Sequence, residues 1–432
     1  LDPILFLCSS VFILSCAMLA VRIIPVIIWL IYNMRKLKWS TATYTAFLQS
    51  IRTKDKQEFI MIFLVMTIAF GIFNANTART INVNEEERIW TKNGADLVIS
   101  EEWTTNQAAI TYAKIQGTVL PDLVYSEPDF WKYDDIKDNI NSLTKVYNEK
   151  DIEVTNVQDD ETHKATTLLL GINTKEFGET AIMTKKINGK HWYTYLNLLA
   201  KDSKNVLVSE NMRKDMNLKI GDTISYSRYT EIDEKTSSAT GVIVGFVDSW
   251  PGYTPREDVK TEEGKLESVE QYLVVANYNQ IYSQFGNIPY ELWINNKAQS
   301  TYIYNFIADN KLRIVKFADS NNDIVKMKND PVFQETNGML TIGFIIVLTL
   351  CMVGFLIYWI LSIRSRELIF GIYRAMGLSM KEIIKMLILE HLFSSVSSIV
   401  FGVGVGLVSS YLFIPLIEIA YSVGASNQSV VT

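Results

Sequence analysis

Long apolar stretches alternate with polar segments along this chain of 432 residues, and they set its predicted architecture. A helix needs about 20 apolar residues to cross the roughly 30 Å hydrocarbon core of a bilayer. Stretches of this length lie at residues 4–30, 59–75, 339–362 and 383–411. Between the second and the third lie about 255 residues of mixed polarity, enough for a domain with its own core. We therefore predict a multi-pass α-helical membrane protein with a large α+β extracellular domain inserted between two transmembrane helices.

Prolines and charges inside the apolar stretches limit where the predicted spans end. Arg22 and Pro25 interrupt the first stretch, so we place the span before Arg22 and an interfacial continuation after it. A further run at 412–420 contains Pro415 and is too short to cross a bilayer. The predicted division is a membrane helix at 1–34, a cytoplasmic amphipathic helix in the headgroup layer at 35–57, a membrane helix at 58–80, the inserted domain at 81–336, a membrane helix at 337–362, a cytoplasmic loop at 363–382, a membrane helix at 383–411 and an outer segment at 412–432.

Short strand patterns and turn signals alternate in the central part of the inserted domain. The segments 206–210, 241–247 and 271–276 have the length and composition of strands. Gly221 and Asp222 mark a turn between a short helix and a returning strand. These patterns predict a mixed α+β core rather than an all-helical insert.

Basic residues gather in the short loops, and acidic residues gather in the inserted domain. The loops after the first and third spans carry Arg35, Lys36, Lys38, Arg364, Arg366 and Arg374. The inserted domain has about 28 Lys and Arg against about 40 Asp and Glu. Because short loops rich in Lys and Arg stay in the cytoplasm, we expect both loops inside the cell and the inserted domain outside.

Motifs for catalysis and for cofactor binding are missing from the sequence. Gly189 and Lys190 are followed by His191 and lack the upstream glycine of a P-loop. No zinc-protease or serine-hydrolase motif occurs, and the three cysteines lie in apolar runs without metal-ligand spacing. The acidic balance argues against nucleic-acid binding. We predict no catalytic residue, no metal and no cofactor in this chain.

The loop at 363–382 predicts a helical hairpin. Its first half is rich in helix formers, and Gly377 stands where a helix commonly ends in the left-handed conformation. Ser379 and Glu382 have the spacing of a capping box, in which each side chain satisfies an orphan amide of the next helix. One interpretation is a docking element for a soluble partner. The other is an ordinary juxtamembrane helix whose arginines reach the lipid headgroups.

Small residues recur every four positions along the last span, at Ser394, Ser398, Gly402, Gly406 and Ser410. Such a ridge lets another helix approach closely, either from the same subunit or from a second one. Glu390 and His391 lie about two turns into the span, where an ionisable group needs a partner. We expect Glu390 to lie near Arg22 or Arg374.

Trp250 and Tyr253 flank a turn at the end of a predicted strand. Pro251 and Gly252 force the turn, and an exposed Trp in a loop can bind an amphipathic ligand or a membrane surface. We predict Trp250 and Tyr253 as an extracellular contact, with burial in the core as the alternative.

Two blocks of residues resemble known permeases. Arg366-Glu367, Gly371 and Arg374-Ala-Met-Gly-Leu-Ser379, just before a membrane helix, resemble the loop of FtsX-like permeases of ABC transporters. The segment 207–247, with LVSE, LKIGDTISY and VIVGFV, resembles the outer core domain of MacB-type, or type VII, permeases. The helix at 35–57 resembles the elbow helix of this family. The first span resembles the linker helix of the larger duplicated permeases, so we expect the C-terminal half of such a protein, with an N-terminal half before it and a last helix after Thr432.

The resemblance implies a permease subunit that passes ATP-driven movement from a cytoplasmic ATPase dimer to the outer domain. The ATPase, not this chain, would bind ATP and magnesium. The positions implied to couple to it are Arg364, Arg366, Glu367, Gly371, Arg374, Gly377 and Ser379. The second permease half or subunit would be a further partner, and the lipid bilayer the surroundings.

The output implied by the resemblance differs among branches of the family. It is export or extraction of a peptide, lipid or lipoprotein, or control of a peptidoglycan hydrolase through an extracellular accessory protein. We expect a multi-pass protein of a bacterial cell membrane, and the richness in Lys, Asn and Ile points to a Gram-positive host. The alternative function is a membrane sensor or scaffold with an extracellular ligand-binding domain.

Overall fold

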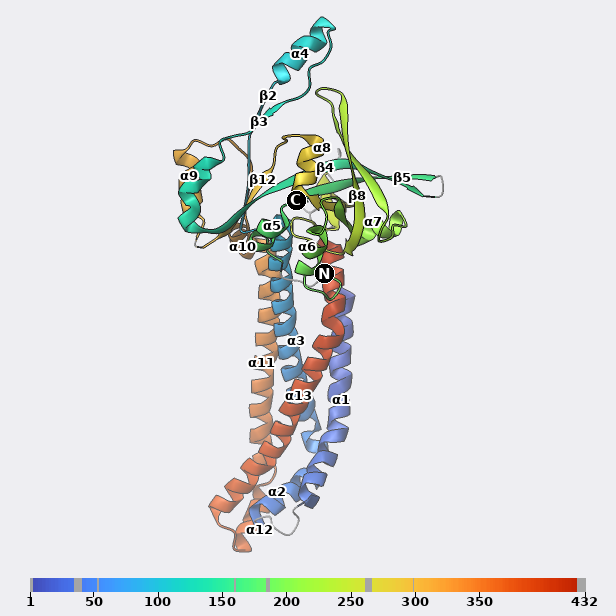
Figure 1. The fold of residues 1–432 in the computed structure, drawn as a ribbon. Helices are drawn as coiled ribbons and strands as arrows, with labels where there is room; N and C mark the ends of the chain where they lie inside the picture. The colour runs from blue at the N-terminus through green and yellow to red at the C-terminus, as the bar shows by residue number, and fades with distance from the viewer. Residues whose placement is uncertain are drawn as a thin grey trace. The chain divides into compact units, whose positions relative to one another are not determined.

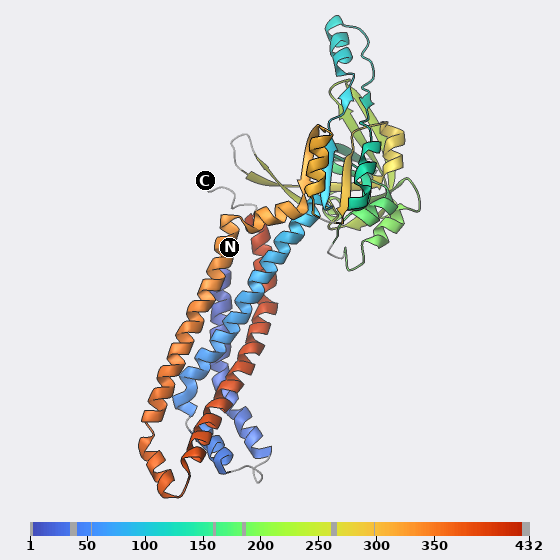
Figure 2. The same ribbon diagram turned by 90° about the vertical axis from the view of Figure 1, so that its left-hand side faces the viewer.

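A computed structural model describes residues 3–34, 41–52, 54–158, 161–183, 187–260, 266–297 and 299–425 (Figures 1 and 2). The chain divides into a helical unit, Leu1–Asn84 with Asn329–Thr432, and a sheet unit, Glu85–Lys328. Parts of four predicted segments lie outside the described residues: 1–2 of the first membrane helix, 35–40 and 53 of the amphipathic helix, 159–160, 184–186, 261–265 and 298 of the inserted domain, and 426–432 of the outer segment.

The helical unit consists of long apolar helices and two short ones. Their bounds are α1 Pro3–Met34, α2 Thr41–Arg52, α3 Lys54–Asn93, α11 Pro331–Arg364, α12 Glu367–Ala375 and α13 Met380–Ala425. Helices long and apolar enough to cross a membrane occur in the described residues at Leu7–Asn33, Met61–Asn93, Pro331–Arg364 and Met380–Leu416. With the inserted α+β unit described below, they confirm the predicted fold class.

Helices α1 and α13 both continue through the proline at which we expected a break. Helix α1 runs past Arg22 and Pro25 to Met34, and α13 runs past Pro415 to Ala425. A proline removes one intrahelical hydrogen bond, but in α1 packing on both sides of Pro25 compensates for this loss. Ile24 and Ile28 are buried on either side of Pro25. The predicted interfacial continuation of α1 and the described part of the outer segment, 412–425, are therefore continuous helix.

Helix α2 buries its apolar face against other helices of the unit. Ala46 and Phe47 are buried, and the Phe47 ring stacks on Phe393 of α13 with centroids 4.1 Å apart. Tyr32 of α1 contacts the same ring at 6.0 Å. The face that we expected in the headgroup layer is thus covered by protein in this region.

The sheet unit is built on a nine-stranded mixed sheet in the order β13-β1-β12-β4-β5-β11-β6-β8-β7, with β4 also paired to β7. Its strands are β1 Leu97–Glu101, β4 Ile140–Gln158, β5 Glu161–Ile172, β6 Asn205–Ser209, β7 Thr223–Thr230, β8 Lys235–Val247, β11 Tyr272–Asn277, β12 Glu291–Asn296 and β13 Ile314–Asp319. Strand β5 is parallel to β11, and β6 is parallel to β8; the other pairs are antiparallel. Because β4 pairs with β5 and also with β7, one part of the sheet curls back on itself.

Short helices and two small two-stranded sheets complete this unit. They are α4 Gln107–Gln116, the 3-10 helix η1 Trp131–Asn139, α5 Thr174–Thr180, α6 Tyr193–Leu199, α7 Glu210–Asp215, α8 Tyr278–Phe285, α9 Thr301–Asp309, α10 Ser320–Lys328, β2 Thr104–Thr105 with β3 Tyr125–Ser126, and β9 Arg256–Lys260 with β10 Leu266–Glu270. Figures 1 and 2 both show α4, with β2 and β3, projecting away from the large sheet.

Both faces of the central strands are buried, which explains their continuous apolar runs. In β5, Leu168 and Leu170 belong to one core cluster, whereas Leu169 belongs to the cluster on the opposite face. Successive strand residues point to opposite faces, so a strand covered on both sides must be apolar at every position. This is the physical reason for the run Leu168-Leu-Leu-Gly-Ile172.

The C-terminal end of α3 is held on the first of these faces. Gly94 follows the helix with a positive φ of 79°, and its N–H bonds the carbonyl of Trp90 at 2.8 Å. A Cβ atom at Gly94 would lie 2.3 Å from the Trp293 ring. The helix therefore ends where only glycine satisfies both the backbone angle and the contact.

Candidate functional site

The hairpin between α11 and α13 has the local structure that the sequence predicts. Gly377 has a φ of +95°, and the N–H groups of Gly377 and Leu378 bond the carbonyls of Arg374 and Tyr373 at 3.0 and 3.1 Å. These two bonds form the glycine-terminated helix end known as a Schellman motif. The turn at Gly377 is confirmed.

The capping box at the start of α13 is confirmed as well. The Ser379 N–H donates to Glu382 Oε2 at 2.9 Å, and the Glu382 N–H donates to Ser379 Oγ at 3.3 Å. The Ser379 hydroxyl also donates to the same carboxylate at 2.8 Å. The reciprocal bonds fix the direction in which α13 leaves the turn.

Helix α12 is short and has no buried residue. Leu368, Ile372 and Met376 are exposed by 86%, 58% and 69%, which is high for large apolar side chains. The predicted coupling positions that are exposed are Arg364, Glu367, Gly371, Arg374, Gly377 and Ser379. The hairpin therefore presents an apolar surface beside basic side chains.

Arg366 differs from the other predicted coupling residues. It is 5% exposed, and its Nη1 donates to both carboxylate oxygens of the fully buried Glu390 at 2.8 Å. Our expectation that Arg366 is free to reach lipid or a partner is wrong, and so is the expectation that Glu390 pairs with Arg22 or Arg374. The sequence signal was present, because a carboxylate inside an apolar helix requires a cation. The sequence alone did not indicate which arginine of the hairpin pairs with Glu390.

The small-residue ridge of α13 packs against α3 of the same chain. A Cβ atom at Gly402 would lie 2.9 Å from Ile68 Cβ, and one at Gly406 would lie 2.9 Å from Ile72 Cβ. Asn76 Nδ2 donates to Ser410 Oγ at 3.0 Å. Ser394 and Ser398 are buried on the same ridge. The ridge is therefore an intrachain interface, the first of the two alternatives that its spacing left open.

Trp250 and Tyr253 are buried, so their prediction as an exposed contact is wrong. Their exposed fractions are 0% and 1%, and the Trp250 ring stacks on Phe177 with centroids 6.1 Å apart. The Tyr253 hydroxyl donates to the carbonyl of Gln271 at 2.8 Å. Burial raises the pKa of Tyr253 to about 12, so the phenol stays a hydrogen-bond donor at neutral pH. The turn at Pro251 forms as expected, but it folds the aromatic rings inward.

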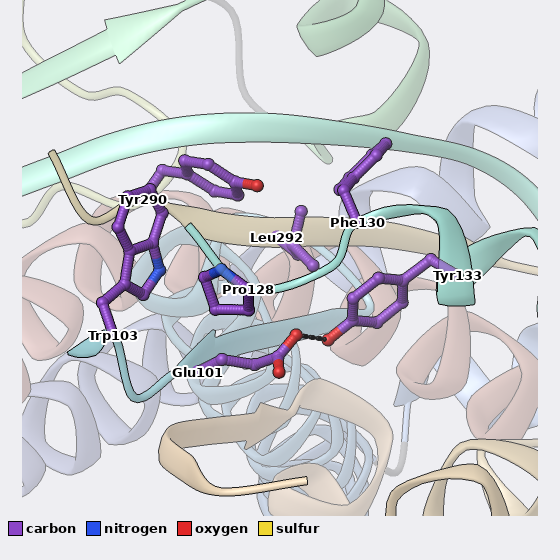
Figure 3. Close-up of a pocket in the computed structure, with 7 residues that line it drawn as sticks. All are labelled: Glu101, Trp103, Pro128, Phe130, Tyr133, Tyr290 and Leu292. Carbon is purple, nitrogen blue, oxygen red and sulfur yellow. Dashed lines mark hydrogen bonds between the residues drawn. The ribbon is translucent and has the colours of Figure 1, made fainter. Parts of the chain in front are cut away.

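A small aromatic cavity lies at one side of the sheet unit (Figure 3). Trp103, Tyr133 and Tyr290 line it together with Glu101, and the Tyr133 hydroxyl donates to Glu101 Oε1 at 2.6 Å. Burial and the Glu101 carboxylate raise the pKa of Tyr133, which keeps the phenol protonated. The cavity volume of about 10 Å³ holds no more than a single water molecule. It is a packing feature rather than a ligand site.

The described residues hold no group of three or more His, Cys, Asp and Glu side chains arranged to bind a metal ion. An exposed hairpin is joined to a long helix through a Gly377 turn, a capping box and a buried ion pair.

Residues 341–430 match the family model described as FtsX-like permease C-terminal. This match contains the hairpin and the ridge of α13, and it confirms the resemblance drawn from the hairpin residues. A search of curated proteins found no match.

A search of solved structures lists the extracellular domain of the noncanonic ABC-type transporter YknZ from Gram-positive bacteria. It is 8% identical in sequence, and the alignment covers 51% of this chain and 100% of that one at a TM-score of 0.26. A superposition this loose carries no argument about function.

Proposed function

From the FtsX-like permease C-terminal domain at residues 341–430, we propose that this chain is a permease subunit of an ABC transporter in a bacterial cell membrane, driven by a separate ATPase. The observation that carries the proposal is the exposed hairpin of α12. It offers apolar side chains and the Arg374 guanidinium to a partner, and nothing in the described residues covers it. The ATPase would bind ATP and magnesium.

The hairpin is suited to transmit force because it is stiffly joined to α13. That helix is 46 residues long without a break. Arg366 holds the start of the hairpin to Glu390 of the same helix. The small-residue ridge would then pass movement of α13 to α3 through close packing, since a Cβ atom at Gly402 would lie 3.0 Å from the Val65 carbonyl oxygen. Helix α3 continues unbroken to Asn93. ATP-driven displacement of α12 would therefore move both long helices together.

Work on an extracellular substrate is the output that we propose. The acidic inserted domain belongs outside by the distribution of basic loops. Export or extraction of a peptide, lipid or lipoprotein and control of a peptidoglycan hydrolase through an accessory protein are the candidate tasks. A second permease half or subunit would complete the complex. The Gram-positive origin rests on composition alone.

Charge reversal on the hairpin tests the proposal. We expect Arg374→Glu to lower co-purification of the partner ABC ATPase with the full-length protein at least tenfold. The reason is that two like charges brought together at an interface cost several kcal/mol of binding free energy. Lys201→Glu, an exposed residue of the sheet unit, makes the same charge change away from the hairpin and should leave co-purification unchanged. Equal recovery of the ATPase with both variants would contradict the proposal.

The sensor or scaffold alternative predicts a different partner. Affinity purification from native membranes should then recover a histidine kinase or another signalling protein in stoichiometric amount, without an ATPase. The exposed apolar surface of α12 fits either partner. The match of residues 341–430 favours the permease.

A further inference from the structure

We propose that the sheet unit contains a binding site for a phosphate-bearing anion, in a basic cavity beside the end of α3. The cavity has a volume of about 600 Å³, which is within the range of small-molecule sites. Its charged lining residues are Arg88, Lys92, Lys150, Arg256, Lys316 and Asp323. Five of these six charged lining residues are basic and one is acidic, in a unit that is acidic as a whole.

Elements far apart in the sequence bring these charges together. Arg88 and Lys92 lie one turn apart on α3, where residues four positions apart share a face. Lys150 comes from β4, Arg256 from the start of β9, and Lys316 from β13. The floor is apolar and rigid, because Trp293 and Leu168 belong to the buried core beneath the cavity.

Carboxylates compensate some of these charges but not all. Lys316 Nζ lies 2.6 Å from Glu291, and Arg88 lies 3.2 Å from Glu85. Asp323 accepts a bond from Asn93 at 3.2 Å and pairs with Lys326 outside the cavity lining. No described carboxylate pairs with Lys92 or with Arg256.

The uncompensated cations define the chemistry of the ligand. Like charges in one cavity repel each other, and an anion that binds between them removes the repulsion. Arg256 offers a planar fork of donors that matches phosphate geometry, and Lys92 adds a mobile ammonium group. The volume exceeds that of a single phosphate ion, so a phosphate ester or a lipid headgroup would fit.

The test is titration calorimetry on the full-length protein in neutral detergent, with two phosphate probes. Inorganic phosphate represents the free anion, dihexanoyl phosphatidylglycerol represents the lipid headgroup, and dihexanoyl phosphatidylcholine is the zwitterionic comparison. We expect the double variant Lys92→Gln with Arg256→Gln to bind the anionic probes at least tenfold more weakly, because each charged hydrogen bond to an anion is lost. Both side chains are exposed, so the variant should keep the melting temperature of the wild type.

A matched double variant, Lys201→Gln with Arg313→Gln, removes the same two residue types elsewhere on the sheet unit. Unchanged affinity in this control supports the site. Failure of the wild type to bind either anionic probe, or an equal loss of affinity in both double variants, would overturn it.

The two probes also separate the sources of the phosphate group. Tighter binding of the anionic lipid than of inorganic phosphate and of the zwitterionic lipid identifies a headgroup site, and equal affinity for phosphate and the anionic lipid identifies a free phosphate site. Because no ATPase takes part, the outcome is independent of the function proposed above.

Discussion

Arg366 and Glu390 form an ion pair that is buried away from water, so neither charge can be solvated if the other is removed. Both side chains are nearly inaccessible to water, and the carboxylate receives both contacts from one guanidinium nitrogen. Removal of either partner leaves an uncompensated charge in an apolar region, whereas replacement of both removes the desolvation cost as well. Arg366 therefore positions the hairpin against α13 instead of contacting a partner protein.

A single and a double variant check this role. We expect Glu390→Gln to lower the free energy of unfolding by about 3–5 kcal/mol, and Arg366→Met with Glu390→Leu to lie close to the wild type. Arg364→Met, an exposed neighbour, should have little effect. The measurement is unfolding by sodium dodecyl sulfate in mixed micelles. A double variant as unstable as Glu390→Gln would show that the pair is not the cause.

Alanine substitutions of Trp250 and Trp131 test which tryptophan is buried in the sheet unit. Trp250 is fully buried and Trp131 is 75% exposed. Trp250→Ala should destabilise the protein by about 3–5 kcal/mol, because it leaves a large cavity. Trp131→Ala should change stability by less than about 0.5 kcal/mol. Chemical denaturation followed by circular dichroism measures both, and similar losses would refute the burial of Trp250.

At the scale of elements, helices α3 and α13 are in close contact along the small-residue ridge. Gly402 and Gly406 leave no space for a side chain because the backbone and Cβ atoms of α3 lie against them. Gly404, on the same helix, has no neighbouring atom within 4 Å of an added Cβ. Gly402 and Gly406 therefore lie on the packed face of α13, and Gly404 lies on an open face.

This difference gives a prediction with its own control. Gly402→Leu should destabilise the protein by about 1–3 kcal/mol or more, because α3 must shift to accept the side chain. Gly404→Leu should be tolerated. Thermal unfolding in detergent and ATP-dependent output in reconstituted membranes are the measurements. If Gly402→Leu retained wild-type stability and output, the ridge would not be the interface that transmits movement.

For the whole molecule, the distribution of charge predicts which side of the membrane each part faces. The hairpin is basic and the inserted domain is acidic, so the hairpin should lie in the cytoplasm and the domain outside. The proposed function requires this arrangement, because an ATPase is available only inside the cell.

Cysteine labelling in intact cells checks the orientation. Cys8, Cys16 and Cys351 are first replaced by serine or alanine, and single cysteines are then introduced as Lys201→Cys and Ala375→Cys. A membrane-impermeant maleimide should label position 201 in intact cells and position 375 only after the cells are permeabilised. Labelling of position 375 from outside would end the permease proposal.

Local signals in the sequence were sufficient for much of the helical unit. Apolar length predicted the membrane helices, and Gly377 with Ser379 and Glu382 predicted the turn and the cap, because these features depend on residues within a few positions of each other. The effects of Pro25 and Pro415 were overestimated, since both helices continue through the loss of one hydrogen bond.

The sequence by itself thus determined the class of the protein, its membrane helices and the shape of the hairpin. The tertiary structure alone decided that Arg366 pairs with Glu390, that Trp250 points into the core and that Lys92 and Arg256 share one cavity. The physical reason is distance along the chain. Which charge is desolvated and which ring is covered depends on segments that meet only after folding, and periodicity within one segment carries no information about that meeting.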